Sequence, residues 1–129
     1  MTTIFTKIIN GEIPCHKIDE DGEFFAFLDI RPVQRGHTLV IPKVEVDKFF
    51  ECDDDVMSKI MVFSKRVANA IEKSVECNRV AVIVAGLEVP HAHVHLIPFS
   101  KMGELSFGHA HNVESEELSM MAEKIISNL

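Results

Sequence analysis

Three histidines alternate with apolar residues in the stretch His91-Ala92-His93-Val94-His95-Leu96-Ile97-Pro98. In a β-strand, successive side chains point to opposite faces, so this pattern predicts that the three imidazoles share one face while the apolar residues enter a core. A row of imidazoles contributes little to packing, because each ring carries polar nitrogens that need partners. The spacing therefore favours a chemical task for these histidines over a merely solvated polar face.

Metal binding is one such task. Two histidines two positions apart can share a zinc ion, whose nitrogen ligands lie at ~2 Å. All three fit one ion less well, because a rise of ~3.3 Å per residue separates the outer α-carbons by about 13 Å. A zinc site would therefore need a further ligand from another part of the chain.

Covalent phosphoryl transfer is the other task. A neutral imidazole nitrogen is a good nucleophile near pH 7, and a neighbouring group can fix which ring nitrogen carries the proton. Flanking imidazoles can donate hydrogen bonds to phosphate oxygens or protonate a leaving group. Because His93 lies between two other histidines, the pattern favours this chemistry, with His93 at its centre.

The composition limits the classes of molecule that the protein could bind, and it predicts a cytoplasmic protein. The chain has 129 residues, the usual size of one domain, and we predict a single domain over residues 1–129. A net charge of −7 weighs against nucleic-acid binding, although a local pocket can still hold one small phosphate ligand. No stretch approaches the ~18 apolar residues of a membrane span, and the start lacks the features of a signal peptide. Three widely spaced cysteines indicate a reducing compartment.

The elements that must position the histidines follow from hydrophobic periodicity and turn residues. Strands are predicted at residues 15–20, 23–28, 37–41, 79–85 and 91–97, with a hairpin turn at Asp21-Gly22. Helices are predicted at residues 4–9, 53–77 and 115–127. The longest helix begins with acidic residues that can cap it and carries apolar residues at helical spacing. This order predicts an α+β fold, a central antiparallel sheet with a long helix and terminal helices packed on it.

Four blocks of the sequence resemble the histidine-triad (HIT) family, in the family's usual order. They are Ile4-Phe5-x-Lys7-Ile8-Ile9-x-Gly11-Glu12-Ile13-Pro14, Phe27-Leu28-Asp29-Ile30, Gly36-His37-Thr38-Leu39-Val40-Ile41-Pro42-Lys43 and the histidine stretch itself. Together they run from about residue 3 to residue 98. The resemblance implies a HIT-like fold.

The resemblance also implies a role for each histidine. His93 would attack the α-phosphorus of a nucleotide and become transiently nucleotidylated, with no cofactor. His95 would contact the phosphate and the departing group. His91 and His37 would complete the polar setting around His93.

A nucleotide pocket is implied in the same way. Asp29 would accept hydrogen bonds from the ribose hydroxyls, with Ile30 beside it. The walls of the base pocket would be Phe5, Ile8, Ile13 and Phe27. From the residues alone, Asp29 equally suits a turn cap, and the four apolar side chains equally suit an ordinary core.

The last histidine of the stretch separates two branches of the superfamily. The nucleotidylyltransferase branch resembles His-Pro-His-x-Gln, whereas this chain has His95 in the last position, which favours hydrolysis. The short chain and the block Glu12-Ile13-Pro14 resemble the Hint-like branch, whose members are homodimers that cleave purine nucleoside phosphoramidates. Hydrolysis of dinucleoside polyphosphates and a regulatory role with incidental catalysis are the alternatives.

The chain departs from the family pattern at a metal site and in a loop. Many bacterial relatives hold a structural zinc through Cys-x-x-Cys near the start, a histidine after Pro-Lys and the first triad histidine. The corresponding residues here are Thr3, Thr6, Glu45 and His91, so no metal is expected. Residues 86–90 read Gly-Leu-Glu-Val-Pro where relatives often carry Gly-Gln-x-Val, which leaves the preference for leaving groups open.

Overall fold

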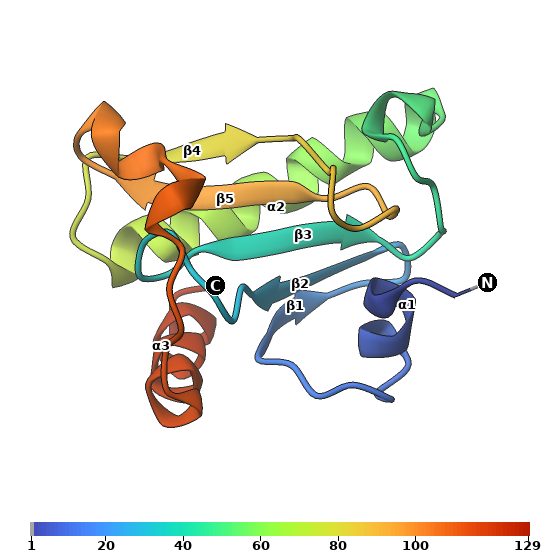
Figure 1. Ribbon diagram of the computed structural model, residues 1–129. Helices are drawn as coiled ribbons and strands as arrows, with labels where there is room; N and C mark the ends of the chain where they lie inside the picture. Colours follow the sequence, from blue (N-terminus) through green and yellow to red (C-terminus); the bar gives the residue numbers. More distant parts are fainter. Residues whose placement is uncertain (1) are drawn as a thin grey trace.

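The fold is built around a five-stranded antiparallel sheet with the strand order β1-β2-β3-β5-β4 (Figure 1). It is seen in a computed structural model that describes residues 2–129. The strands are Lys17–Glu20 (β1), Phe24–Leu28 (β2), Thr38–Pro42 (β3), Arg79–Ile83 (β4) and Val94–Phe99 (β5). The helices are Ile4–Ile9 (α1), Asp54–Ser74 (α2) and Ser115–Ser127 (α3), with short 3-10 helices at Phe49–Glu51 (η1), Met102–Leu105 (η2) and Phe107–His109 (η3). The predicted α+β class with a central antiparallel sheet is confirmed.

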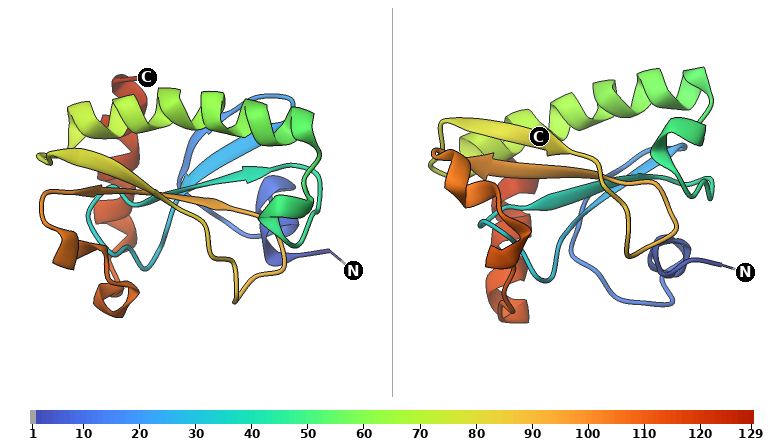
Figure 2. Two further views of the ribbon diagram at one scale, coloured as in Figure 1. Left: turned by 90° about the horizontal axis from the view of Figure 1, so that it is seen from above. Right: turned by 45° about the horizontal axis from the view of Figure 1, so that its top comes forward.

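The two faces of the sheet are covered differently, with α2 on one side and α1 on the other (Figure 2). Every residue of β2 is buried, because both faces of this strand pack against other elements. Phe24, Ala26 and Leu28 belong to a larger core with residues of α2 and α3. Phe25 and Phe27 belong to a smaller core that includes Phe5 of α1. Alternating side chains of one strand thus join two cores on opposite faces of the sheet.

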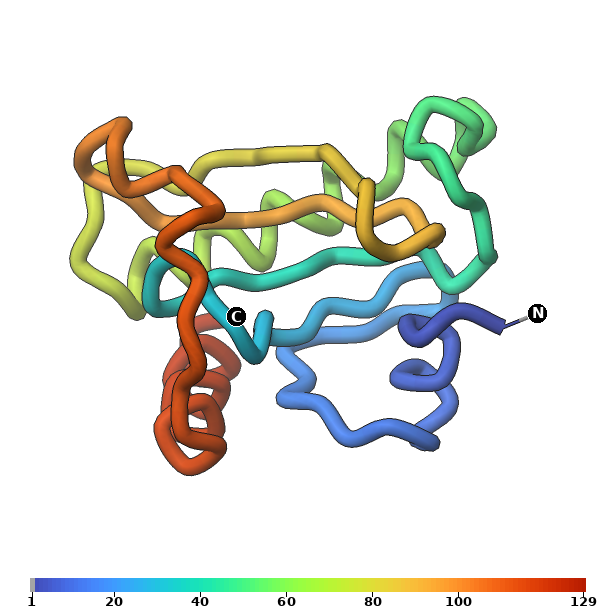
Figure 3. Tube along the Cα trace, in the orientation of Figure 1, coloured from blue at the N-terminus to red at the C-terminus, as the bar shows by residue number. Residues whose placement is uncertain are grey.

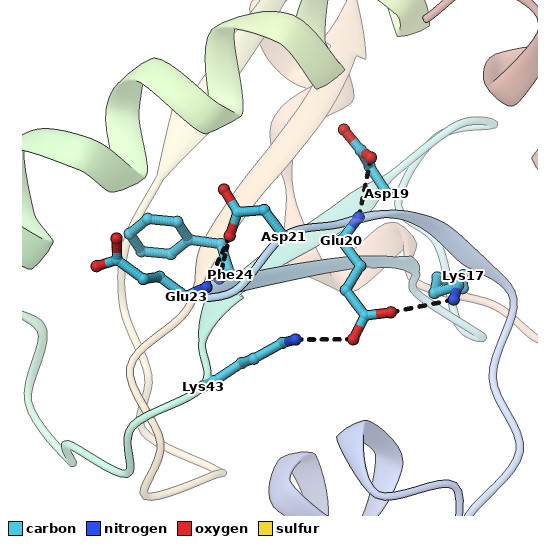
Figure 4. A network of polar contacts seen from close by, with 7 residues as sticks. All are labelled: Lys17, Asp19, Glu20, Asp21, Glu23, Phe24 and Lys43. Carbon is cyan, nitrogen blue, oxygen red and sulfur yellow. Dashed lines mark hydrogen bonds and ion pairs between the residues drawn. The ribbon is translucent and has the colours of Figure 1, made fainter.

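The β1–β2 hairpin closes at the predicted turn (Figure 4). Asp21 Oδ1 accepts hydrogen bonds from the backbone N–H groups of Glu23 and Phe24, both at 2.8 Å. Gly22 is not among the left-handed glycines of the chain. The Asp21 carboxylate, rather than an unusual glycine conformation, therefore stabilises this turn.

The bounds of α1 and α3 are those predicted, whereas α2 is shorter than predicted. Asp53 caps α2, as expected, by accepting a hydrogen bond from the backbone N–H of Val56 at 3.1 Å. The helix ends at Ser74 rather than near Cys77, because Val75 adopts an extended conformation and packs against the larger core. Burial of this β-branched side chain favours the extended conformation over a further turn of helix. No helix within residues 2–129 has the length and apolar character needed to cross a membrane.

The predicted strand over residues 91–97 is wrong at its start. β5 begins at Val94, and its pairing with β3 covers Val94–Leu96. Before that point, the backbone N–H groups of His91 and Ala92 donate to the carbonyls of Val89 and Val46 instead. His91 and His93 therefore lie in the loop before the strand, and His95 alone lies within it. The other strands differ from the predicted ranges only at their ends.

Candidate active site

Four histidines and one phenylalanine form a row of rings on the α1 side of the sheet. The ring centroids of His37 and His95 are 5.2 Å apart, and those of His95 and His93 are 4.9 Å apart. Phe5 continues the row, at 5.1 Å from His93 and 5.7 Å from His91. All four histidines are buried. The structure thus brings together the four predicted catalytic residues from β5 and from the segments that precede β3 and β5.

Neighbouring groups determine which nitrogens of His37 and His95 carry protons. The backbone N–H of Val33 donates to His37 Nδ1 at 3.0 Å, so the proton of a neutral His37 is on Nε2. This Nε2–H donates to His95 Nδ1 at 2.9 Å, which leaves the proton of a neutral His95 on its own Nε2. Burial lowers the pKa of His37 to about 3 and the pKa of His95 to about 4. Both rings are therefore neutral near pH 7.

His93 has the opposite tautomer. Its Nδ1 lies 2.7 Å from the backbone carbonyl oxygen of His91, which can only accept, so Nδ1 carries the proton and Nε2 has a free lone pair. Among residues 2–129, Ser64 Oγ is the only fully buried side-chain polar atom without a hydrogen-bond partner. The Nε2 atoms of His93 and His95 are therefore at least partly accessible to solvent. A bare imidazole nitrogen beside an N–H donor suits nucleophilic attack on a phosphorus atom.

His91 is held at both ring nitrogens. Its Nε2 donates to the backbone carbonyl of Pro42 at 2.8 Å, and its Nδ1 lies 2.7 Å from the Thr3 hydroxyl oxygen. Burial lowers the pKa of this ring, which favours its neutral form. With both nitrogens occupied, His91 acts on His93 through its backbone carbonyl.

Asp29 follows β2 and faces the row of histidines while also closing a turn. Its Oδ1 accepts a hydrogen bond from the backbone N–H of Arg31 at 2.9 Å. Its Oδ2 lies 3.7 Å from His37 Nε2, a contact without ion pairing because His37 is neutral. Burial raises the pKa of Asp29, and the hydrogen bond from Arg31 opposes that rise. The geometry thus combines the turn-capping contact with a position beside the candidate active site.

The apolar residues predicted for the base pocket lie in different environments. Phe5 and Phe27 are buried in edge-to-face contact, with ring centroids 5.6 Å apart, and Ile8 packs against the same smaller core. Ile13 is half-buried, whereas the side chain of Ile30 is 63% exposed. Phe5 is thus both a core residue and a neighbour of His93, and Ile30 faces solvent.

Two further residues border the row: Phe107, which sequence reasoning missed, and Gly86, the first residue of the loop at residues 86–90. Phe107 of η3 packs edge-on against His95, with ring centroids 5.0 Å apart, because the chain after β5 turns back across the sheet before it reaches α3 (Figure 3). Gly86 has a φ of +75°, and a Cβ there would lie 3.8 Å from His93 Cε1. No local pattern marks Phe107, since only the path of the chain brings it to His95.

Two clusters of side chains lie where a metal ion could be considered. Asp29, His37 and His95 each offer one ligand atom within 4.8 Å of the others. His37 Nε2 and His95 Nδ1, however, share one proton in a 2.9 Å hydrogen bond, so an ion there would have to displace it. Where the family resemblance would place zinc-binding thiolates, Thr3 and Thr6 carry hydroxyl groups, which are hydrogen-bonded to His91 and to the Glu45 carboxylate. This donor set does not fit a structural zinc, which prefers cysteine and histidine ligands.

The fold and the row of rings define an α+β protein in which an imidazole with an unprotonated Nε2 lies beside a neutral imidazole N–H donor. A family model described as the HIT domain matches residues 10–102. The chain belongs to the HIT family, as the sequence blocks indicated.

Relatives cover nearly the whole chain. An uncharacterized HIT-like protein of Methanocaldococcus jannaschii is 40% identical over 123 residues, which are 89% of this chain and 94% of that protein. An adenosine 5'-monophosphoramidase of Schizosaccharomyces pombe is 35% identical over 133 residues, covering 100% of this chain and 99% of the relative. A hypothetical histidine triad nucleotide-binding protein from Sulfolobus tokodaii has a TM-score of 0.86 at 31% identity, with 96% of this chain and 89% of that chain covered. The predicted HIT-like fold is confirmed.

Proposed function

We propose that this protein hydrolyses purine nucleoside 5'-phosphoramidates, or related adenylated compounds, through a nucleotidyl-histidine intermediate. One observation carries the proposal: the unprotonated Nε2 of His93 is partly accessible to solvent beside the protonated Nε2 of His95. The similarity to an adenosine 5'-monophosphoramidase over the full chain supports the substrate class.

In the first step, the lone pair of His93 Nε2 attacks the α-phosphorus, and the bond from phosphorus to the amine nitrogen breaks. The amine leaves with that electron pair and takes a proton from water, which becomes hydroxide. The hydroxide then attacks phosphorus, and His93 leaves with its electron pair as a neutral ring. The products are a nucleoside monophosphate and a free amine, so one water molecule is consumed.

Each neighbour of His93 has a task in this scheme. The N–H of His95 donates to a phosphoryl oxygen or to the leaving atom, and this hydrogen bond strengthens as charge develops. His37 fixes the proton on His95 Nε2 by donating to the other ring nitrogen. The His91 carbonyl fixes the tautomer of His93. Splitting one displacement into two easier ones is the general advantage of a covalent intermediate.

The nucleoside part would lie along the α1 side of the site. Asp29 is proposed to accept hydrogen bonds from the ribose hydroxyls, with the exposed Ile30 beside it. Phe5, Ile8, Ile13 and Phe27 are proposed to form the apolar wall for the base. The contact between Phe5 and His93 supports this placement of the nucleoside, because it puts the apolar wall next to the proposed nucleophile.

The test of the proposed function is turnover on three adenylated compounds: an adenosine phosphoramidate, a dinucleoside triphosphate and a dinucleoside tetraphosphate. His93→Ala should abolish turnover, commonly by several orders of magnitude for a lost covalent nucleophile, while AMP binding largely survives. Preference for the polyphosphates would replace the proposed substrate class. Nucleotide binding with only background turnover in the unmodified protein would indicate a regulator instead.

We also propose that the protein is a cytoplasmic homodimer. β4 is an edge strand of the sheet, and its Val82 is 49% exposed. Val84, which follows the strand, is 38% exposed. An edge strand with exposed apolar side chains is a ready site for pairing with a second chain. The free cysteines Cys15, Cys52 and Cys77 fit a reducing compartment.

A further inference from the structure

Four polar side chains meet where the start of α1 contacts the loop before β5. Glu45 Oε1 accepts hydrogen bonds from the Thr3 backbone N–H at 2.8 Å and from the Thr6 hydroxyl at 2.6 Å. These two hydrogen bonds hold the pKa of Glu45 below its usual range, with the Thr6 hydroxyl as the larger cause. Glu45 is therefore an ionised acceptor that gathers the first turn of α1 around one carboxylate oxygen.

The hydroxyl of Thr3 extends these contacts to His91. Because His91 Nε2 donates to the Pro42 carbonyl, its Nδ1 is the accepting nitrogen, and the Thr3 hydroxyl must donate to it at 2.7 Å. The same Thr3 oxygen accepts from the backbone N–H of Thr6 at 3.1 Å, which caps α1. One threonine thus joins the helix start to the histidine.

The contacts continue from His91 to the nucleophile through the backbone. The His91 ring is fixed between Thr3 and the end of β3, so its own carbonyl has a defined direction. That carbonyl accepts the Nδ1–H of His93 at 2.7 Å. The geometry of a buried hydrogen bond depends on both partners being held in place, so movement of His91 would release the His93 ring.

We propose that Thr3 and Glu45 are positioning residues for His93. They hold His91 so that its carbonyl fixes the tautomer and the orientation of the nucleophile, without a metal ion. The inference rests on the proposed function, because positioning matters for turnover only if His93 is the nucleophile. Neither residue touches the reacting atoms.

The experiment compares Thr3→Val, which removes the hydroxyl at nearly constant shape, with Thr3→Ser, which keeps it. Glu45→Ala is the second variant, and it removes an exposed side chain, so the fold should tolerate it. For each protein, kcat and KM on an adenosine phosphoramidate and AMP binding are measured. The ring nitrogens of His93 are observed by ¹⁵N NMR, which reports the tautomer directly.

We expect Thr3→Val and Glu45→Ala to lower kcat about fivefold to tenfold, the effect of one lost hydrogen bond. KM and AMP binding should stay within about twofold, and Thr3→Ser should restore kcat. The NMR spectrum should show a single Nδ1–H tautomer of His93 in the unmodified protein and a mixture in Thr3→Val.

Two results would overturn the positioning role. An unchanged kcat with an unchanged His93 tautomer would show that the contacts do not reach the nucleophile. A loss confined to KM and AMP binding would show that Thr3 merely caps α1, whose Phe5 borders the site. If the unmodified protein turns over none of the compounds, the proposed function fails, while the tautomer still decides whether Thr3 and Glu45 position His93.

Discussion

At the scale of single residues, the site depends on which nitrogen of each imidazole carries a proton. The Val33 N–H, His37 and His95 form one chain of hydrogen bonds that ends in a solvent-facing N–H donor. The His91 carbonyl produces the reverse arrangement on His93 and leaves a nucleophilic lone pair. Two adjacent imidazoles thus have opposite tautomers because their partners differ, although the residues are chemically identical.

Replacement of Asp29 would show whether this turn residue also recognises the sugar. An ionised carboxylate that accepts hydrogen bonds from hydroxyl groups contributes roughly 1.5–3 kcal/mol for such a contact. Asp29→Ala should therefore weaken a ribonucleotide ligand by roughly tenfold to a hundredfold, measured by titration calorimetry. A 2',3'-dideoxy analogue is the control, since it has no hydroxyl to lose and should weaken much less. Equal losses for the two ligands would assign Asp29 to the turn alone.

At the scale of elements, the site depends on three segments that converge on one face of the sheet. β5 carries His95, and the irregular loop before it carries His91 and His93. The start of α1 reaches that loop through Thr3, and the loop after β3 reaches α1 through Glu45. Hydrogen bonds hold these elements together in the place where the family resemblance would put a structural zinc.

The hydroxyl and carboxylate groups of Thr3, Thr6 and Glu45 predict that the protein binds no structural zinc. Protein expressed with added zinc should contain no stoichiometric zinc by elemental analysis, and a chelator should leave the melting temperature unchanged. The positive control is the triple variant T3C/T6C/E45H, which replaces weak oxygen donors with thiolate and imidazole ligands and should gain about one ion per chain. Zinc near one ion per chain in the unmodified protein would contradict this account of Thr3, Thr6 and Glu45.

At the scale of the whole molecule, the sheet separates a helix-packed core from the face that holds the histidines. The larger core, on the side of α2 and α3, contains no residue of the proposed site. The smaller core shares Phe5 and Phe27 with the proposed pocket. Burying neutral histidines beside that second core makes stability depend on pH. The family model covers residues 10–102, and one domain over residues 1–129 stays a prediction.

The sign of this dependence follows from the two most perturbed histidines. Burial lowers the pKa of His37 to about 3 and the pKa of His95 to about 4 in the folded state. In the unfolded chain a histidine titrates near ~6.5, so acid protonates the unfolded state first. The stabilising contribution is therefore complete above about pH 6.5 and is lost as the pH falls toward the folded values.

Urea unfolding should show a lower free energy of unfolding at pH 5 than at pH 7, by up to about 2 kcal/mol for each of these histidines. His37→Asn, whose side chain does not titrate, should lose less stability between the two values than the unmodified protein. A free energy of unfolding that is constant or rises on acidification would show that these rings are not held neutral in the folded state.

The sequence by itself determined most of the fold, and it predicted a chemical class for the site. The alternation around His93, the periodicity of α2 and the turn at Asp21 are local patterns, and local patterns respond to backbone geometry and burial alone. The bounds of α1 and α3 were predictable for the same reason. The grouping of His37 with the triad came from family resemblance, and the structure places its ring beside His95.

Only the tertiary structure decided how the histidines are held. β5 begins at Val94, where its pairing with β3 starts, and the preceding residues bond to the loop carbonyls of Val89 and Val46 instead. The loop conformation of His93 therefore depends on contacts outside the sheet. The same holds for Phe107 beside His95 and for Thr3 beside His91, which lie far from their partners in sequence. Tautomers and hydrogen-bond partners are set by neighbours in space, and a linear pattern does not encode which neighbours those are.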